Sequence, residues 1–198
     1  VDYNRFLWYI ILHGIILNTR PKRSAKLYKK IWTKKGSPLM VHMKDIVKKI
    51  QQRMNQKNLQ IELGMRYGVP SLESAIDKFK KNNVIKVVII PLYPQAGSPT
   101  SSSTYDKISS ILKTLPWVPH IRFVNGYHDR VDYINAIHNT IMASVQAIND
   151  IEIMIFSFHG MPLRYLNEGD PYYCFCHKTA RLIAENLKIE KGKYSLAF

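Results

Sequence analysis

One histidine stands where a predicted strand ends and a turn begins. The apolar run 151–156 leads into Ser-Phe-His-Gly-Met-Pro at 157–162, so His159 enters a Gly-Pro turn. In open parallel α/β sheets, ligands bind beyond the carboxyl ends of the strands, and imidazole accepts a proton or ligates a metal near neutral pH. His159 is therefore a candidate proton acceptor and metal ligand. A hydrogen-bonded structural histidine is the alternative interpretation.

Aromatic and cationic side chains follow other predicted strands. Arg66 and Tyr67 come directly after the run 59–65, Tyr93 follows the run 85–92, and Tyr105 lies a little further along the chain. Such groups suit a large, planar, anionic ligand. For Arg66, a salt bridge that holds the strand end is an equal alternative.

A Ser/Thr cluster at 98–104 follows the same strand as Tyr93. Hydroxyls and free backbone N–H groups at a strand-to-helix turn favour an anion. The simpler interpretation is a helix N-cap, which needs only one of these hydroxyls.

The two cysteines, Cys174 and Cys176, are separated by one residue. This spacing is too close for an ordinary disulfide, so a reducing compartment is favoured. With His177 they offer three metal ligands, but they lack the two-plus-two spacing of structural zinc sites.

Several familiar sites are absent from the sequence. It contains no Gly-x-Gly-x-x-Gly, no Gly-x4-Gly-Lys-Ser/Thr, no Gly-x-Ser-x-Gly and no His-Glu-x-x-His. Nucleotide-driven chemistry and serine hydrolysis therefore have no support.

The elements that must position these residues alternate from residue 59 onward. Short β-rich runs are separated by helical patterns, which predicts βαβ units around a doubly wound parallel sheet in an α/β fold. The predicted strands are 59–65, 85–92, 120–124, 151–158 and 194–198. The predicted cover helices are 71–82, 101–114, 131–149 and 177–188. Before residue 59 the pattern predicts three helices, 5–17, 24–32 and 38–55, with no strand between them.

The chain is strongly basic, with 29 Lys and Arg against 14 Asp and Glu and a net charge of +15. This balance favours anionic partners, although most of the lysines fall on predicted helix surfaces and in loops, where solvation accounts for them. No nucleic-acid-binding module is recognisable, so no nucleic-acid partner is expected. The apolar stretch 6–17 is too short to span a bilayer.

Six segments, in this order, resemble the ferrochelatase family, closest to its bacterial soluble form. They are Gly-Ser-Pro-Leu at 36–39, Ile-Glu-Leu-Gly-Met-Arg-Tyr-Gly at 61–68, Pro-Leu-Tyr-Pro-Gln at 91–95, Asp-Tyr-Ile-Asn-Ala at 132–136, the His159 turn at 157–162, and Arg-Tyr-x-x-Glu-Gly-Asp-Pro-Tyr at 164–172. Their spacing covers almost the whole chain. The resemblance implies insertion of Fe(II) into protoporphyrin IX, the last step of haem synthesis.

The resemblance also implies a domain organisation. The family has two Rossmann-like domains with the porphyrin between them, so we expect an N-terminal domain at 1–148, without its first strand, and the start of a second domain at 149–198. The chain also ends inside the predicted strand 194–198 and begins without Met, which leads us to expect a fragment. The acidic partner of His159 at the metal site is expected beyond Phe198.

The chemistry agrees with this resemblance. Metal insertion removes two pyrrole protons, and imidazole, with an ordinary pKa of about 6.5, is the side chain suited to accept them. It is also a good ligand for iron. The resemblance therefore implies His159 as catalytic residue and metal ligand. It implies porphyrin binding by Ser37, Arg66, Tyr67, Tyr93 and Tyr105.

The resemblance carries expectations about partners and location. Fe(II) and protoporphyrin IX are the expected small-molecule substrates, no prosthetic group is expected, and the expected location is the cytoplasm. Some relatives have an iron–sulfur ligand cysteine in the loop after Gln95, where this chain has Ser98, so no such cluster is expected. The segment 6–17 is expected either to form a cleft lip with peripheral membrane contact or to pack as an ordinary helix.

The loop at 96–102 departs from the family. Relatives usually read Tyr-Ser-x-Ser-Thr-Thr-Gly there, whereas this chain reads Ala-Gly-Ser-Pro-Thr-Ser-Ser. Two alternatives therefore stay open: a tetrapyrrole-binding protein that inserts no metal, and a chelatase for another metal or tetrapyrrole.

Overall fold

The computed structural model describes residues 4–54, 56, 58–145 and 151–198. The contacts of the chain divide it into two compact units, the first ending at Gly64 and the second beginning at Met65. No helix among the described residues is both long and apolar enough to cross a membrane.

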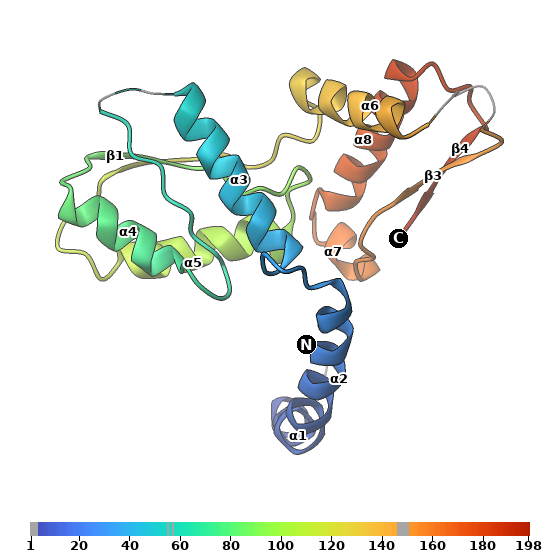
Figure 1. The fold of residues 1–198 in the computed structure, drawn as a ribbon. Helices are drawn as coiled ribbons and strands as arrows, with labels where there is room; N and C mark the ends of the chain where they lie inside the picture. Colours follow the sequence, from blue (N-terminus) through green and yellow to red (C-terminus); the bar gives the residue numbers. More distant parts are fainter. Residues whose placement is uncertain (1–3, 55, 57, 146–150) are drawn as a thin grey trace. The chain divides into compact units, whose positions relative to one another are not determined.

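The first unit opens with an unbroken helical run. It consists of α1 (Arg5–Ile11), the π-helix η1 (Leu12–Ile16) and α2 (Leu17–Ile31), shown in blue in Figure 1. The predicted break between 17 and 24 is wrong, because Pro21 lies inside α2. Side chains support the backbone there: the Asn18 amide donates to the carbonyls of His13 and Gly14, and the Thr19 hydroxyl to that of Ile15.

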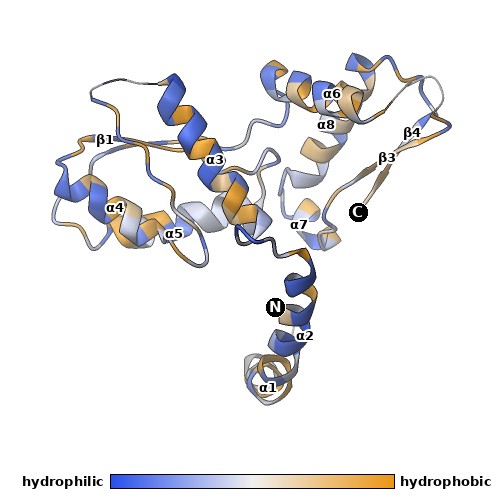
Figure 2. Ribbon diagram, viewed as in Figure 1, coloured by the Kyte–Doolittle hydropathy of each residue, from blue (hydrophilic) through white to orange (hydrophobic). Residues whose placement is uncertain are grey.

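Helix α3 (Pro38–Arg53) begins with the signals expected from its sequence. Thr33 and Gly36 exchange backbone hydrogen bonds of 3.0 Å around a tight turn, and the φ of +112° at Gly36 suits glycine. The Ser37 hydroxyl then caps the helix by accepting from the N–H of Met40, with Pro38 at the first helical position. Figure 2 shows hydrophilic and hydrophobic residues interleaved along α3.

The predicted strand 59–65 is not formed. Among the described residues of this stretch, only Met65 makes a β-type contact, an isolated bridge to Ser71, with its N–H donating to the carbonyl of Pro70. A strand needs a ladder partner for its backbone groups, and no other strand of the described chain pairs with this segment.

The second unit contains a first parallel sheet with two cover helices. Strand β1 (Lys86–Ile89) pairs with β2 (His120–Phe123), with Val87 opposite Ile121. Helices α4 (Leu72–Lys81) and α5 (Ser103–Leu112) lie side by side in Figure 1. Helix α4 precedes β1, and α5 connects β1 to β2 in the βαβ order. The core of this part contains Leu72, Ile76 and Ile108, with Phe79, Ile89, Ile111, Leu112 and Leu115 packed against it.

A second parallel sheet is formed by β3 (Met154–Ser157) and β4 (Tyr194–Ala197). Helices α6 (Val131–Ser144) and α8 (Tyr172–Asn186) pack on each other and on this sheet, and the short α7 (Leu163–Asn167) lies between β3 and α8. Its core contains Ile134, Ile183 and Leu187, packed against residues such as Met154 and Phe156.

The boundaries of two helices differ from the prediction. Helix α8 begins at Tyr172 rather than 177, because Pro171 occupies the position before it and Cys176, Ala180 and Ala184 continue one buried face. Helix α6 ends at Ser144, where Val145 turns to extended backbone with ψ of 137°, and the predicted continuation over 146–149 lies outside the described residues. Parallel pairing with helices between successive strands confirms the predicted α/β class.

Candidate functional site

His159 lies two residues beyond the carboxyl end of β3, with an exposed side chain. Its ring Nδ1 is 2.8 Å from the backbone carbonyl oxygen of Gly160. A carbonyl oxygen only accepts, so this contact assigns the proton of the neutral ring to Nδ1. The lone pair of the neutral imidazole is then on Nε2, which is the atom that can accept a proton or ligate a metal.

The backbone of His159 is held by Tyr172, the first residue of α8. The N–H of His159 donates to the Tyr172 hydroxyl oxygen over 3.2 Å. The buried thiol of Cys176, one helical turn further along α8, lies near the same hydroxyl. Burial, and after it the neighbouring Cys176, raises the pKa of Tyr172 to about 12, so the phenol stays neutral at physiological pH.

Asp170 joins the start of α8 to the loop after β1. Its Oδ1 accepts from the N–H of Tyr172 at 2.9 Å, and its Oδ2 accepts from the N–H of Ser98 at 2.7 Å. Burial raises the pKa of this carboxyl, but the hydrogen bonds from Ser98 and Tyr172 outweigh it and hold the pKa below its ordinary value. The Ser/Thr cluster was expected to favour an anion, and at Ser98 that anion is the carboxylate of Asp170.

Two further contacts connect the loop after β1 to α8. A Cβ on Gly97 would lie 3.0 Å from the Tyr172 Cβ, so the loop and the helix approach as closely as a glycine allows. The side-chain amide of Gln95 donates to the Thr179 hydroxyl at 3.0 Å, while the carbonyl of His128 accepts from that hydroxyl at the same distance. Helix α8 and the residues at its start thus hold both the loop after β1 and the His159 turn.

Arg66 is held at the start of α5. Its Nε donates to both the carbonyl and the hydroxyl oxygen of Ser103, each at 3.0 Å, and its guanidinium lies 4.5 Å from the centroid of the Tyr67 ring. In the described part of the chain these contacts, rather than the alternative salt bridge, fix the side chain. Tyr105, in the first turn of the same helix, packs edge-on against Phe123, with ring centroids 5.3 Å apart.

The remaining predicted residues are placed separately. Tyr67, Tyr93 and Tyr105 are exposed. Tyr93 lies beyond the carboxyl end of β1, at the same sheet edge as the Ser98 loop. Ser37 caps α3 in the first unit. Substrate binding by these residues stays a prediction.

The cysteines do not form a metal site. Cys174 is exposed and Cys176 is buried, and no group of three His, Cys, Asp or Glu residues suited to a metal ion occurs in the described part of the chain. The zinc alternative for Cys174, Cys176 and His177 is therefore wrong. Burial raises the pKa of Cys176 to about 11, which leaves a neutral thiol that can accept a hydrogen bond from Tyr172.

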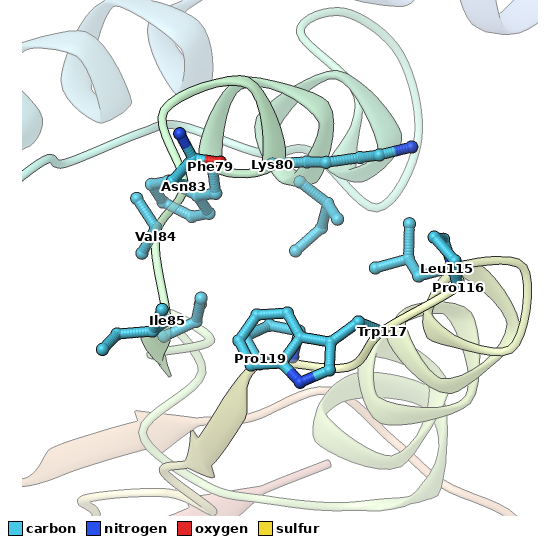
Figure 3. A pocket seen from close by; sticks show the side chains of 11 residues that line it. Phe79, Lys80, Asn83, Val84, Ile85, Leu115, Pro116, Trp117 and Pro119 are labelled. Atoms are coloured by element: carbon cyan, nitrogen blue, oxygen red, sulfur yellow. The ribbon is translucent and has the colours of Figure 1, made fainter.

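Two pockets lie at different ends of the second unit's sheets. One of about 140 Å³ is beside the His159 turn, lined by residues that include Met161, Tyr165, Tyr172 and Phe198. Another of about 260 Å³, shown in Figure 3, lies at the amino ends of β1 and β2 and is lined by apolar side chains such as Phe79 and Trp117. Lys80 is the one ionisable residue in the lining of this pocket.

Sequence reasoning did not single out Asp170 and Tyr172 as site residues. A usable signal was present, because an Asp-Pro pair directly before a helical pattern is typical of a helix start. That signal locates the carboxylate and the tyrosine, but their contacts with Ser98 and His159 come from the tertiary structure.

Comparisons with known proteins agree with the resemblance. The ferrochelatase family model matches residues 1–198. Curated ferrochelatases of Nitrosococcus oceani and Idiomarina loihiensis are each 41% identical over the whole chain, which covers 54% and 55% of their lengths. A protein named ferrochelatase 2 from Shewanella oneidensis is 40% identical, and the chain covers 61% of it. The chain thus spans little more than half the length of these relatives, and it belongs to the ferrochelatase family.

Proposed function

We propose that the protein containing this chain inserts Fe(II) into protoporphyrin IX to form protohaem. The observation that carries the proposal is the combination of family membership along all 198 residues with a strand-end histidine whose Nε2 is left to accept a proton. Fe(II) is a substrate in this reaction, and no prosthetic group is needed.

His159 has two roles in the proposal. Each insertion releases the two protons of the pyrrole N–H groups as the porphyrin nitrogens bind Fe(II), and the Nε2 lone pair of His159 accepts a proton or contacts the ion. In the described chain, His159 does not belong to a group of three His, Cys, Asp or Glu residues that could hold a metal ion. In the proposed site, the porphyrin nitrogens and an acidic residue elsewhere in the protein are therefore the other ligands of Fe(II).

The proposed porphyrin contacts include one cationic and three aromatic side chains of the second unit. Arg66 is a cation held rigidly by Ser103, and Tyr67, Tyr93 and Tyr105 present exposed ring surface. Such groups suit the carboxylates and the flat faces of a tetrapyrrole. Ser37 is included on the basis of the Gly-Ser-Pro-Leu segment.

The rest of the proposal concerns organisation and location. We propose an N-terminal domain at 1–148 and the start of a second at 149–198, which the separate pairing of β1 with β2 and of β3 with β4 supports. Helix α6 belongs to the proposed first domain by sequence, although it packs on α8 and shares a core with the second sheet. The proposed location is the cytoplasm, with peripheral membrane contact through segment 6–17, which exposes Phe6, Leu7 and Ile10 beside a basic helix. Ser98 replaces the cysteine that an iron–sulfur cluster would need.

The experiment measures metalloporphyrin formation by absorbance, using the protein as its gene encodes it. His159→Ala should lower the turnover rate by about 10²- to 10⁴-fold, the usual contribution of a general base. His120→Ala is the matched control, because His120 is also exposed but begins β2, at the amino end of a strand in the other sheet. An unchanged rate for His159→Ala would overturn the proposed mechanism.

The departure of loop 96–102 favours one second candidate, a tetrapyrrole-binding protein that inserts no metal. The same absorbance titration separates the two functions, because porphyrin binding without metalation by the unaltered protein would support only the binding function. Comparison of Fe(II), Co(II) and Zn(II) rates tests for a chelatase with another metal.

A further inference from the structure

The hydroxyl group of Tyr172 holds the backbone of the His159 turn. It accepts from the backbone N–H of His159 at 3.2 Å. The backbone of the exposed His159 turn is thereby attached to a side chain that is fixed at its other end.

The position of Tyr172 is itself fixed from two directions. Its own N–H is bound by Asp170, which also binds Ser98, and its Cβ lies against Gly97. Cys176, one helical turn further along α8, has no exposed surface and belongs to the buried face of that helix. Tyr172 therefore connects the His159 turn to the helix core and to the loop after β1.

From these contacts we infer that Tyr172 is a positioning residue for His159, which it acts on through the backbone without touching substrate. The inference rests on the proposed function, because it assigns a residue that serves the same proton acceptor. Rotation of the His159 backbone would move the Gly160 carbonyl, which accepts the hydrogen bond from Nδ1. That hydrogen bond keeps the ring proton on Nδ1 and so leaves the lone pair of Nε2 available to accept a proton or ligate the metal. Residues that orient a ligating histidine typically contribute about 10- to 100-fold to activity or metal affinity.

The first test is kinetic. Tyr172→Phe keeps the ring but removes the hydroxyl, and should lower kcat for metalloporphyrin formation by about 10-fold or more while leaving the KM for porphyrin within about 2-fold. Tyr173→Phe is the matched control, since the neighbouring ring stacks on Phe198 and no hydrogen bond of its hydroxyl occurs in the described structure. An unchanged kcat for Tyr172→Phe, or an equal loss in Tyr173→Phe, would overturn the inference.

The second test does not depend on activity. In the unaltered protein, the His159 amide should exchange its hydrogen about 10-fold or more slowly than the Gly160 amide, which has no acceptor among the described residues. Nitrogen NMR should show the ring proton of neutral His159 on Nδ1. Equal exchange of the two amides, or a mainly Nε2-protonated ring, would contradict the inference.

The kinetic and exchange measurements together distinguish failure of the positioning role of Tyr172 from failure of the proposed function. If the unaltered protein forms no metalloporphyrin while the His159 amide is protected and the Nδ1 tautomer is observed, the proposed function fails and the positioning contact stands. If metalloporphyrin forms at a rate that Tyr172→Phe leaves unchanged, the proposed function stands and the positioning role fails.

Discussion

Asp170 Oδ2 lies 2.7 Å from the backbone nitrogen of Ser98, although 72 residues separate them in the sequence. The other carboxylate oxygen accepts from the N–H of Tyr172. One buried carboxylate therefore fixes the loop after β1 to the start of the helix that supports His159. Both hydrogen bonds are stronger to the charged carboxylate than to the neutral acid. The contact between the loop after β1 and the start of α8 therefore depends on the ionisation of Asp170.

The stability contributed by Asp170 should depend on pH. Its pKa is lowered in the folded state, so its contribution is present above its ordinary value near 4 and is lost as the pH falls through the folded value. Asp170→Asn should reduce the free energy of unfolding by about 2 kcal/mol at pH 7, the contribution expected for hydrogen bonds to a charged group. The difference from the unaltered protein should shrink as the pH is lowered from 6 to 3.

Urea unfolding at a series of pH values measures this difference. Asp45→Asn is a suitable control, because Asp45 is exposed in the middle of α3 and should change stability by less than about 0.5 kcal/mol at any pH. A stability difference for Asp170→Asn that stays constant from pH 7 to 3 would show that the carboxylate charge is not the source of the effect.

Gly97 should not tolerate a side chain. Its backbone is extended, so the reason is space rather than conformation: an added Cβ would lie 3.0 Å from the Tyr172 Cβ and 3.2 Å from Asp170 Oδ1. Gly97→Ala should destabilise the protein by about 1 to 3 kcal/mol, as overpacking does, and should also reduce protection of the His159 amide from exchange. Gly14→Ala is the contrasting variant, since a Cβ there meets nothing within 4 Å. Equal stability of the two variants in thermal unfolding would refute the close approach.

The sequence predicted those parts of the fold whose signals are local. Local patterns located α3 and α4, predicted at 38–55 and 71–82, to within two residues at each end, and β-rich runs located four strands. The segment 59–65 has the same composition but no ladder partner in the described chain, and strand pairing is not a local property. The position of His159 after β3 was likewise predictable, because a strand followed by a Gly-Pro turn is a short-range pattern.

The supports of the candidate site could not be predicted in the same way. Arg66 to Ser103, Ser98 to Asp170 and His159 to Tyr172 join residues that are 37, 72 and 13 positions apart. Each contact depends on how two elements pack, and no periodicity in either segment specifies its partner. The sequence therefore located the candidate imidazole, His159, whereas only the structure identifies the residues that hold it.

Cys176 should be chemically inert in the folded protein, in contrast to Cys174. The thiolate is the reactive form, and burial raises the pKa of Cys176 to about 11, so at pH 8 only about one thiol in a thousand would be ionised. Cys174, two residues earlier, is exposed on the same helix. A thiol reagent at pH 8 should therefore label Cys174 rapidly and Cys176 only on unfolding, and Cys174→Ser should remove the rapid phase of Cys174. Rapid labelling of Cys176 in Cys174→Ser would show that its sulfur is accessible, which would contradict the buried face of α8 on which Cys176 lies.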